Sequence, residues 1–128
     1  MGTPESNFWK IVRKNLPKKS FATRIENRIA SGVPDCHIVW DKLSFWLELK
    51  TTKNNTIKVS PNQIAWNTAY CKNKGVSFIL VKDPRDKHLY LFDGIRASEL
   101  FDKGIDTKYL YRGSCFKELF SVIGSGRV

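Results

Sequence analysis

Two short pieces of the chain carry residues that could do chemistry: Pro34-Asp35, and the triplet Glu48-Leu49-Lys50 that begins 13 positions after Asp35. Because side chains alternate between the faces of a strand, a strand through the triplet places Glu48 and Lys50 on one side. Two carboxylates can hold a hard cation through oxygen, and a neighbouring lysine can orient or polarise an attacking water. Metal-dependent phosphodiester hydrolysis needs this set of groups. The alternative is a solvated ion pair worth roughly 0–1 kcal/mol, and an isolated triplet does not separate the two interpretations.

The composition indicates one globular domain over residues 1–128 with a polyanionic partner. Hydrophobic residues make up 41% of the chain, and its formal net charge is +10, from 22 Lys and Arg against 12 Asp and Glu. This balance favours nucleic acid first and an anionic membrane second. No apolar run approaches the roughly 18 residues of a membrane span, and the N-terminus lacks the hydrophobic region of a signal peptide. We therefore expect a cytoplasmic protein that does not associate with membranes.

Three cysteines, Cys36, Cys71 and Cys115, are far apart in the sequence and show no CxxC spacing. An odd number with this spacing favours neither a zinc site nor a disulfide framework. We expect reduced and mostly buried thiols.

The pattern of apolar and turn-forming residues predicts a mixed sheet with helices packed on it. Ser60 as N-cap, Pro61 at the first helical position and Gln63 at the capping-box position predict a helix that stops at Gly75. An earlier helix is expected to open at Thr3 and run to about Asn15. The other predicted elements are strands over 20–29, 35–40, 43–52, 76–81 and 88–92, and helices over 97–103 and 115–123.

With this order of elements, the chain resembles the PD-(D/E)xK nuclease superfamily. Pro34-Asp35 and Glu48-Leu49-Lys50 match its two motif positions, and the strings GVPD, ELK and SPNQ follow one another on the expected elements. Their combination resembles the virus-type replication-repair (VRR-NUC) branch and small phage endonucleases, which are related in fold to archaeal Holliday-junction resolvases. The resemblance covers about residues 3 to 95. It implies a restriction-endonuclease-like α/β (α+β) core, αβββαβ, with C-terminal additions.

Carried over residue by residue, the resemblance makes Asp35 and Glu48 the metal ligands, together with the backbone carbonyl of Leu49. Lys50 would lie beside the water nucleophile and the scissile phosphate. Gln63 matches a family glutamine that points back at the site, although a capping-box glutamine needs no catalytic role.

The family often adds one more acid, for which the chain offers two candidates. Glu5 shares a helix face with apolar residues, yet an acid in the first helical turn is also common because of the helix dipole. Glu26 would project with Arg24 and Arg28 from one strand face, where it could equally be ion-paired. The basic residues expected to border the site and hold flanking phosphates are Arg24, Arg28, Lys53 and Lys58.

The resemblance implies a Mg²⁺- or Mn²⁺-dependent DNA endonuclease, with branched or junction DNA as one substrate class. A symmetric homodimer would suit a two-fold junction. The apolar stripe of the last helix, at Phe116, Leu119, Phe120 and Ile123, would then either form a dimer interface or pack within the monomer. The rival interpretations are a non-catalytic DNA-binding module and an RNA-directed nuclease. The resemblance places the protein in the cytoplasm of a bacterial or phage-infected cell.

Overall fold

The structure is a computed structural model that describes residues 4–25 and 32–125, apart from the side chain of Glu5. In this part of the chain the elements are α1 (Pro4–Lys14), β1 (Phe21–Arg24), β2 (Cys36–Trp40), β3 (Leu43–Thr51), α2 (Pro61–Lys72), β4 (Ser77–Lys82), β5 (Leu89–Asp93), η1 (Gly94–Arg96), α3 (Ala97–Lys103), η2 (Gly104–Asp106), β6 (Tyr111–Gly113) and α4 (Phe116–Ser125).

The strands form one mixed sheet in the order β1-β2-β3-β4-β5-β6. Neighbouring strands are antiparallel except β3 and β4, which are parallel and joined through α2. A parallel pair needs such a crossover, because a tight turn can only connect antiparallel strands. The predicted mixed α/β architecture is confirmed, and β6 is an added strand that the sequence pattern did not predict.

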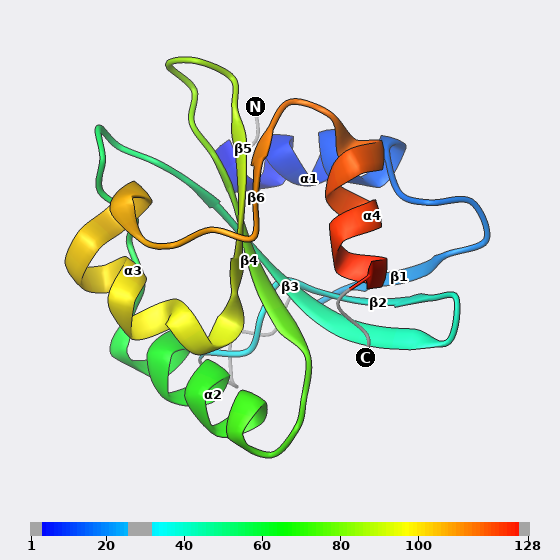
Figure 1. Cartoon of the computed structure of the whole chain (residues 1–128), viewed down its shortest axis with the longest axis horizontal. Coiled ribbons are helices and arrows are strands. Elements are labelled where there is room, and N and C mark those ends of the chain that lie inside the picture. The colour runs from blue at the N-terminus through cyan, green and yellow to red at the C-terminus, as the bar shows by residue number, and fades with distance from the viewer. Residues whose placement is uncertain (1–3, 26–31, 126–128) are drawn as a thin grey trace.

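Helices cover both faces of the sheet, and the sheet separates two hydrophobic clusters (Figure 1). On one face, α1 and α4 pack on alternate strand residues, among them Ile38, Leu47 and Leu80. On the other, α3 packs on Ile79, Val81 and Phe92. Because β4 is buried on both faces, its sequence is a continuous apolar run.

The N-terminus of α2 forms as its sequence predicts. Ser60 is the N-cap, its Oγ accepts from the Gln63 amide, and the Gln63 side chain accepts in return from the Ser60 amide. The other end differs from the prediction. The helix ends at Lys72 and is capped by Asn73, and Lys74, rather than Gly75, takes the positive φ of 69°.

The structure also bears on the predictions for β1, for the start of α1 and for the apolar stripe of α4. The strand predicted over 20–29 ends at Arg24 in the described part, and the proposed cap Thr3 lies outside the described residues. Leu119, Phe120 and Ile123 of α4 are buried within the monomer, so they are not free to form a dimer interface.

The cysteines are all free, but the expectation of burial is wrong for Cys115, which is exposed, whereas Cys36 is buried and Cys71 half-buried. Over the described residues, no helix combines the length and the apolar character that a membrane crossing requires.

Candidate active site

The predicted carboxylates and lysine lie together on the α2 side of the sheet. Glu48 and Lys50 pair in register with Ile79 and Val81 of β4, whose side chains belong to the core beneath α3. Asp35 lies just before β2 and reaches β3 directly: its Oδ2 accepts from the Leu49 amide at 2.7 Å. Asp35 is therefore held by the backbone of the strand that carries the other two groups.

Gln63 joins the two charged groups of β3. Its Oε1 accepts from the Lys50 ammonium at 3.0 Å, and its Nε2 donates to Glu48 Oε2 at 3.2 Å. The same Oε1 also accepts from the Ser60 amide in the capping box. The Gln63 side chain therefore both caps α2 and contacts the charged groups of β3, two possibilities between which the sequence did not decide.

The approach of α2 to this site depends on Gly32, three residues before Asp35. Gly32 has a φ of 94°, a conformation that favours glycine, and a Cβ there would collide with the backbone carbonyl of Asn62. The segment that carries Asp35 therefore packs directly against the first turn of α2, beside Gln63.

The surroundings of Glu48 contain more negative than positive charge. Glu48 is only 5% exposed. Burial and the neighbouring charge of Asp35 raise the pKa of Glu48 to about 8, although Lys50, 3.8 Å away, acts in the opposite direction. Two carboxylates facing one ammonium leave room for a further cation, and oxygen donors suit a hard divalent ion. The residues present therefore fit Mg²⁺ or Mn²⁺.

No third acid joins this pair among the residues that the structure describes, which contain no group of three or more His, Cys, Asp or Glu able to hold a metal. Glu26 lies outside the described residues. Glu5 lies in the first turn of α1, but its side chain is also outside what is described. Both remain predictions.

The predicted phosphate-binding residues are divided. Lys53 and Lys58 line an open groove of about 510 Å³ together with Lys50. Arg24, by contrast, pairs in register with Cys36, on the α1 side of the sheet, and its guanidinium lies 5.9 Å from the centre of the Trp9 ring. The structure therefore does not bring Arg24 to the carboxylates, and Arg28 is outside the described residues.

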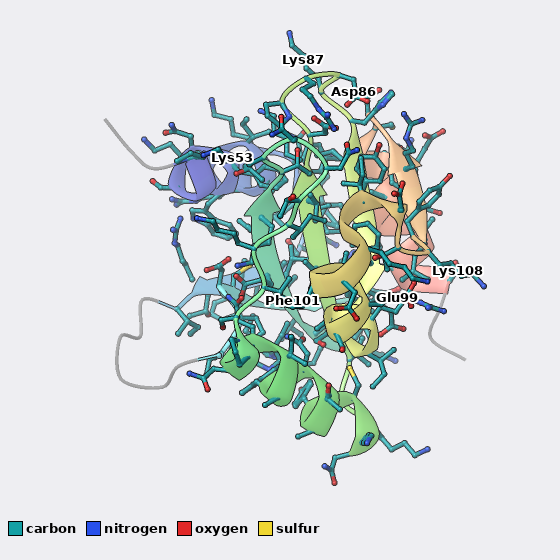
Figure 2. All side chains as sticks on the ribbon, turned by 90° about the vertical axis from the view of Figure 1, so that its left-hand side faces the viewer. Lys53, Asp86, Lys87, Glu99, Phe101 and Lys108 are labelled. Atoms are coloured by element: carbon teal, nitrogen blue, oxygen red, sulfur yellow. The ribbon has the colours of Figure 1, made fainter. Side chains whose placement is uncertain are left out.

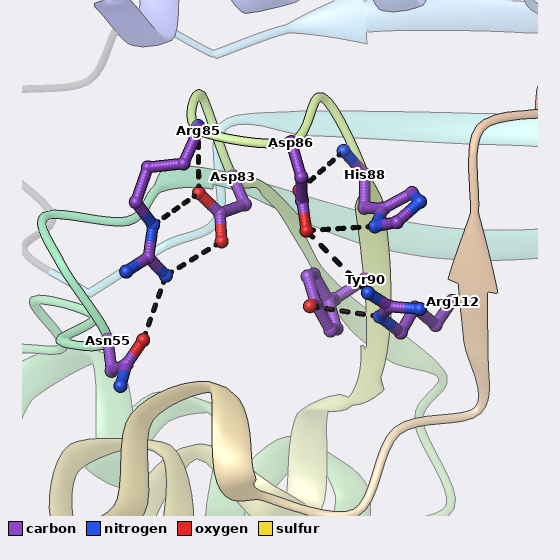
Figure 3. Close-up of polar contacts among 7 residues, drawn as sticks. All are labelled: Asn55, Asp83, Arg85, Asp86, His88, Tyr90 and Arg112. Carbon is purple, nitrogen blue, oxygen red and sulfur yellow. Dashed lines mark hydrogen bonds and ion pairs between the residues drawn. The ribbon is translucent and has the colours of Figure 1, made fainter.

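The loop that bears Lys53 and Lys58 is fixed by contacts of Asn55 with residues far away in the sequence. The Asn55 side chain accepts from Arg85 Nη2 at 2.8 Å (Figure 3). The Asn55 backbone carbonyl accepts from the Ile105 amide at 3.2 Å. Arg85 in turn makes two side-chain hydrogen bonds with the buried Asp83, at 3.0 and 2.9 Å, which lower the pKa of Asp83. A turn motif such as Asp-Pro-Arg-Asp does not reveal such a long-range contact.

Comparison with known proteins identifies a neighbour in fold. The structure is similar to that of Hjc from Archaeoglobus fulgidus, described as a Holliday junction resolvase from an archaeal hyperthermophile, with a TM-score of 0.52. The match covers 70% of this chain and 74% of the resolvase chain at 16% sequence identity. The fold is restriction-endonuclease-like. At this identity the likeness concerns the restriction-endonuclease-like fold alone, and neither a family model nor a curated protein matches the sequence.

Proposed function

We propose that this protein is a metal-dependent endonuclease that hydrolyses phosphodiester bonds in DNA and prefers branched DNA. The observation that carries the proposal is the connected group of Asp35, Glu48, Lys50 and Gln63 on a nuclease-type fold. A protein that only binds DNA would gain nothing from a buried acid beside a lysine, because burying a charged group costs free energy through desolvation.

Asp35, Glu48 and the Leu49 carbonyl would hold Mg²⁺ or Mn²⁺. Such an ion, when bound, supplies Lewis-acid polarisation of the phosphate and a water of lowered pKa.

The protein's own groups would bind and orient the substrate. Lys50 is 15% exposed at its side chain, so its ammonium reaches the groove while Gln63 holds it in place. There it would stabilise negative charge that develops on the phosphate. Gln63 also fixes the Glu48 carboxylate, and Lys53 and Lys58 would bind phosphates on either side of the cut.

A nucleic acid is the expected polyanion because of the net charge of +10. Selectivity for junctions or other branches is supported by the fold of the resolvase neighbour. A symmetric homodimer would present two such sites to a two-fold junction. Placement in the VRR-NUC branch, with phage endonucleases as relatives, is part of this proposal and rests on the order of the GVPD, ELK and SPNQ motifs.

The test is cleavage of end-labelled four-way junction, flap and linear duplex DNA, and of RNA of the same sequence, with Mg²⁺, Mn²⁺ or EDTA. We expect metal-dependent cuts that Lys50→Ala reduces by about 100-fold or more. Lys117→Ala is the matched control, because Lys117 is an exposed lysine on α4, across the sheet from the site.

Full activity in EDTA would contradict the proposal. Tight binding without cuts in any metal would instead favour the DNA-binding module, and cuts confined to RNA of the same sequence would favour an RNA-directed nuclease. Glu5→Gln and Glu26→Gln, tested alongside, would show which acid joins the site.

A further inference from the structure

A phenylalanine on α3 lies beside the candidate site with most of its surface in water. Phe101 is 60% exposed, whereas its neighbours Ala97 and Leu100 are completely buried. Single exposed apolar residues are common, so exposure by itself does not indicate a binding site. The position of Phe101 is more informative, because Phe101 lies between a groove lined partly by charged and polar residues and an apolar groove.

One of these grooves belongs to the candidate active site. It has a volume of about 470 Å³ and is lined by Lys50, Lys58 and Gln63 as well as by Phe101. Figure 2 shows Phe101 on the same side of the molecule as Lys53. The ring therefore borders the place where the proposed function puts the scissile phosphate.

The other groove is apolar and follows one face of α2. It has a volume of about 600 Å³, and besides Phe101 its lining residues are Pro61, Ile64, Ala65, Thr68, Ala69 and Lys72. From Pro61 to Lys72 this face is about 16 Å long at about 1.5 Å per residue, which is longer than one nucleobase. An apolar surface with Lys58 near one end and Lys72 at the other suits a ligand with flat apolar rings and negative charges between them.

We propose that Phe101 and this face of α2 bind unpaired nucleotides next to the cleaved phosphate, with one base stacked on the Phe101 ring. The inference rests on the proposed nuclease function and defines its substrate class: DNA with unstacked bases at the cut, such as a flap or an open branch point. Bases within a continuous duplex have both faces covered by their neighbours and offer none to the ring. Stacking of one base on an aromatic side chain contributes about 5- to 150-fold in affinity.

The test measures binding, not cleavage, in EDTA. Affinity is determined for a flap DNA with four unpaired nucleotides and for a continuous duplex of equal charge, with wild type, Phe101→Ala, Phe101→Tyr and Phe21→Ala. Phe21 is the matched control, since it is also a largely exposed phenylalanine, 70% exposed, on the edge strand β1. A 2-aminopurine in the unpaired segment reports stacking through its fluorescence.

We expect Phe101→Ala to weaken flap binding about 5- to 150-fold, to change duplex binding less than twofold, and to abolish the fluorescence change. Phe101→Tyr should retain both properties, and Phe21→Ala should behave as wild type. Equal losses on both DNAs, or no loss on the flap, would overturn the inference. If the wild type binds but cleaves nothing with any metal, the nuclease proposal fails, whereas the stacking site is still decided by these affinities.

Discussion

The side-chain amide of Gln63 donates to the buried carboxylate of Glu48 across 3.2 Å, and so couples the first turn of α2 to the middle of β3. Its carbonyl oxygen accepts from Lys50 at the same time. One residue therefore orients both the carboxylate that would hold the metal and the ammonium that would stabilise charge on the phosphate.

Replacing Gln63 by alanine should reduce cleavage about 10- to 100-fold, because the hydrogen bonds that orient Glu48 and Lys50 are lost. DNA affinity in EDTA should change little. Ser60→Ala is the control: it removes the Oγ that caps α2, at a cost of about 1 kcal/mol, but leaves the Gln63 contacts with β3 intact. If both variants lost activity equally, Gln63 would be only a helix cap.

The raised pKa of Glu48 predicts how stability changes with pH without metal. Between its ordinary value of 4.5 and about 8, the folded state keeps a proton that the unfolded state has lost. Its contribution to stability is therefore fully present at low pH and decreases as pH rises to about 8, by at most about 1.4 kcal/mol per pH unit.

Urea unfolding in EDTA from pH 5 to 8.5 measures this effect, and Glu48→Gln should flatten the profile. A carboxylate must be deprotonated to bind a metal ion, and Glu48 loses its proton near the upper end of this pH range. Saturating Mg²⁺ should therefore stabilise the wild type most at the upper end. A wild-type profile as flat as that of the variant would contradict the assigned burial of Glu48.

Lys58→Ala should lower the salt dependence of DNA binding. If Lys58 contacts one phosphate, the slope of log affinity against log salt concentration should decrease by about 0.9, because one fewer counterion is released. Lys53→Ala should act in the same way, since both lysines line the groove. Lys117→Ala on α4 should leave the slope unchanged, and an equal effect of all three would indicate non-specific attraction only.

Gly32→Ala should destabilise the fold by more than about 1 kcal/mol, because alanine disfavours the positive φ and its Cβ meets the Asn62 carbonyl. Cleavage should also fall when measured well below the melting temperature, since the displaced segment carries Asp35. Gly124→Ala is the control, because a Cβ there meets only the Trp40 ring at 3.4 Å, an ordinary contact. Normal cleavage by Gly32→Ala would show that Asp35 does not depend on this packing.

The local sequence by itself determined most of the elements, β6 excepted, and the parts of the site that depend on local rules. The period of two places Glu48 and Lys50 on one face of β3, and the Ser60–Gln63 spacing specifies the start of α2. The mixed sheet could be predicted because the hairpins and the crossover helix are each encoded in a few consecutive residues.

The tertiary structure alone decided which residues from distant parts of the chain lie together on one face of the sheet. Arg24 lies on the α1 side because β1 pairs with β2 in one register, and a shift by one residue would reverse its direction. The contact between Asn55 and Arg85 and the place of Phe101 beside Lys50 join residues 30 or more positions apart. No local periodicity encodes such contacts, because they arise only when separate elements pack on the same sheet.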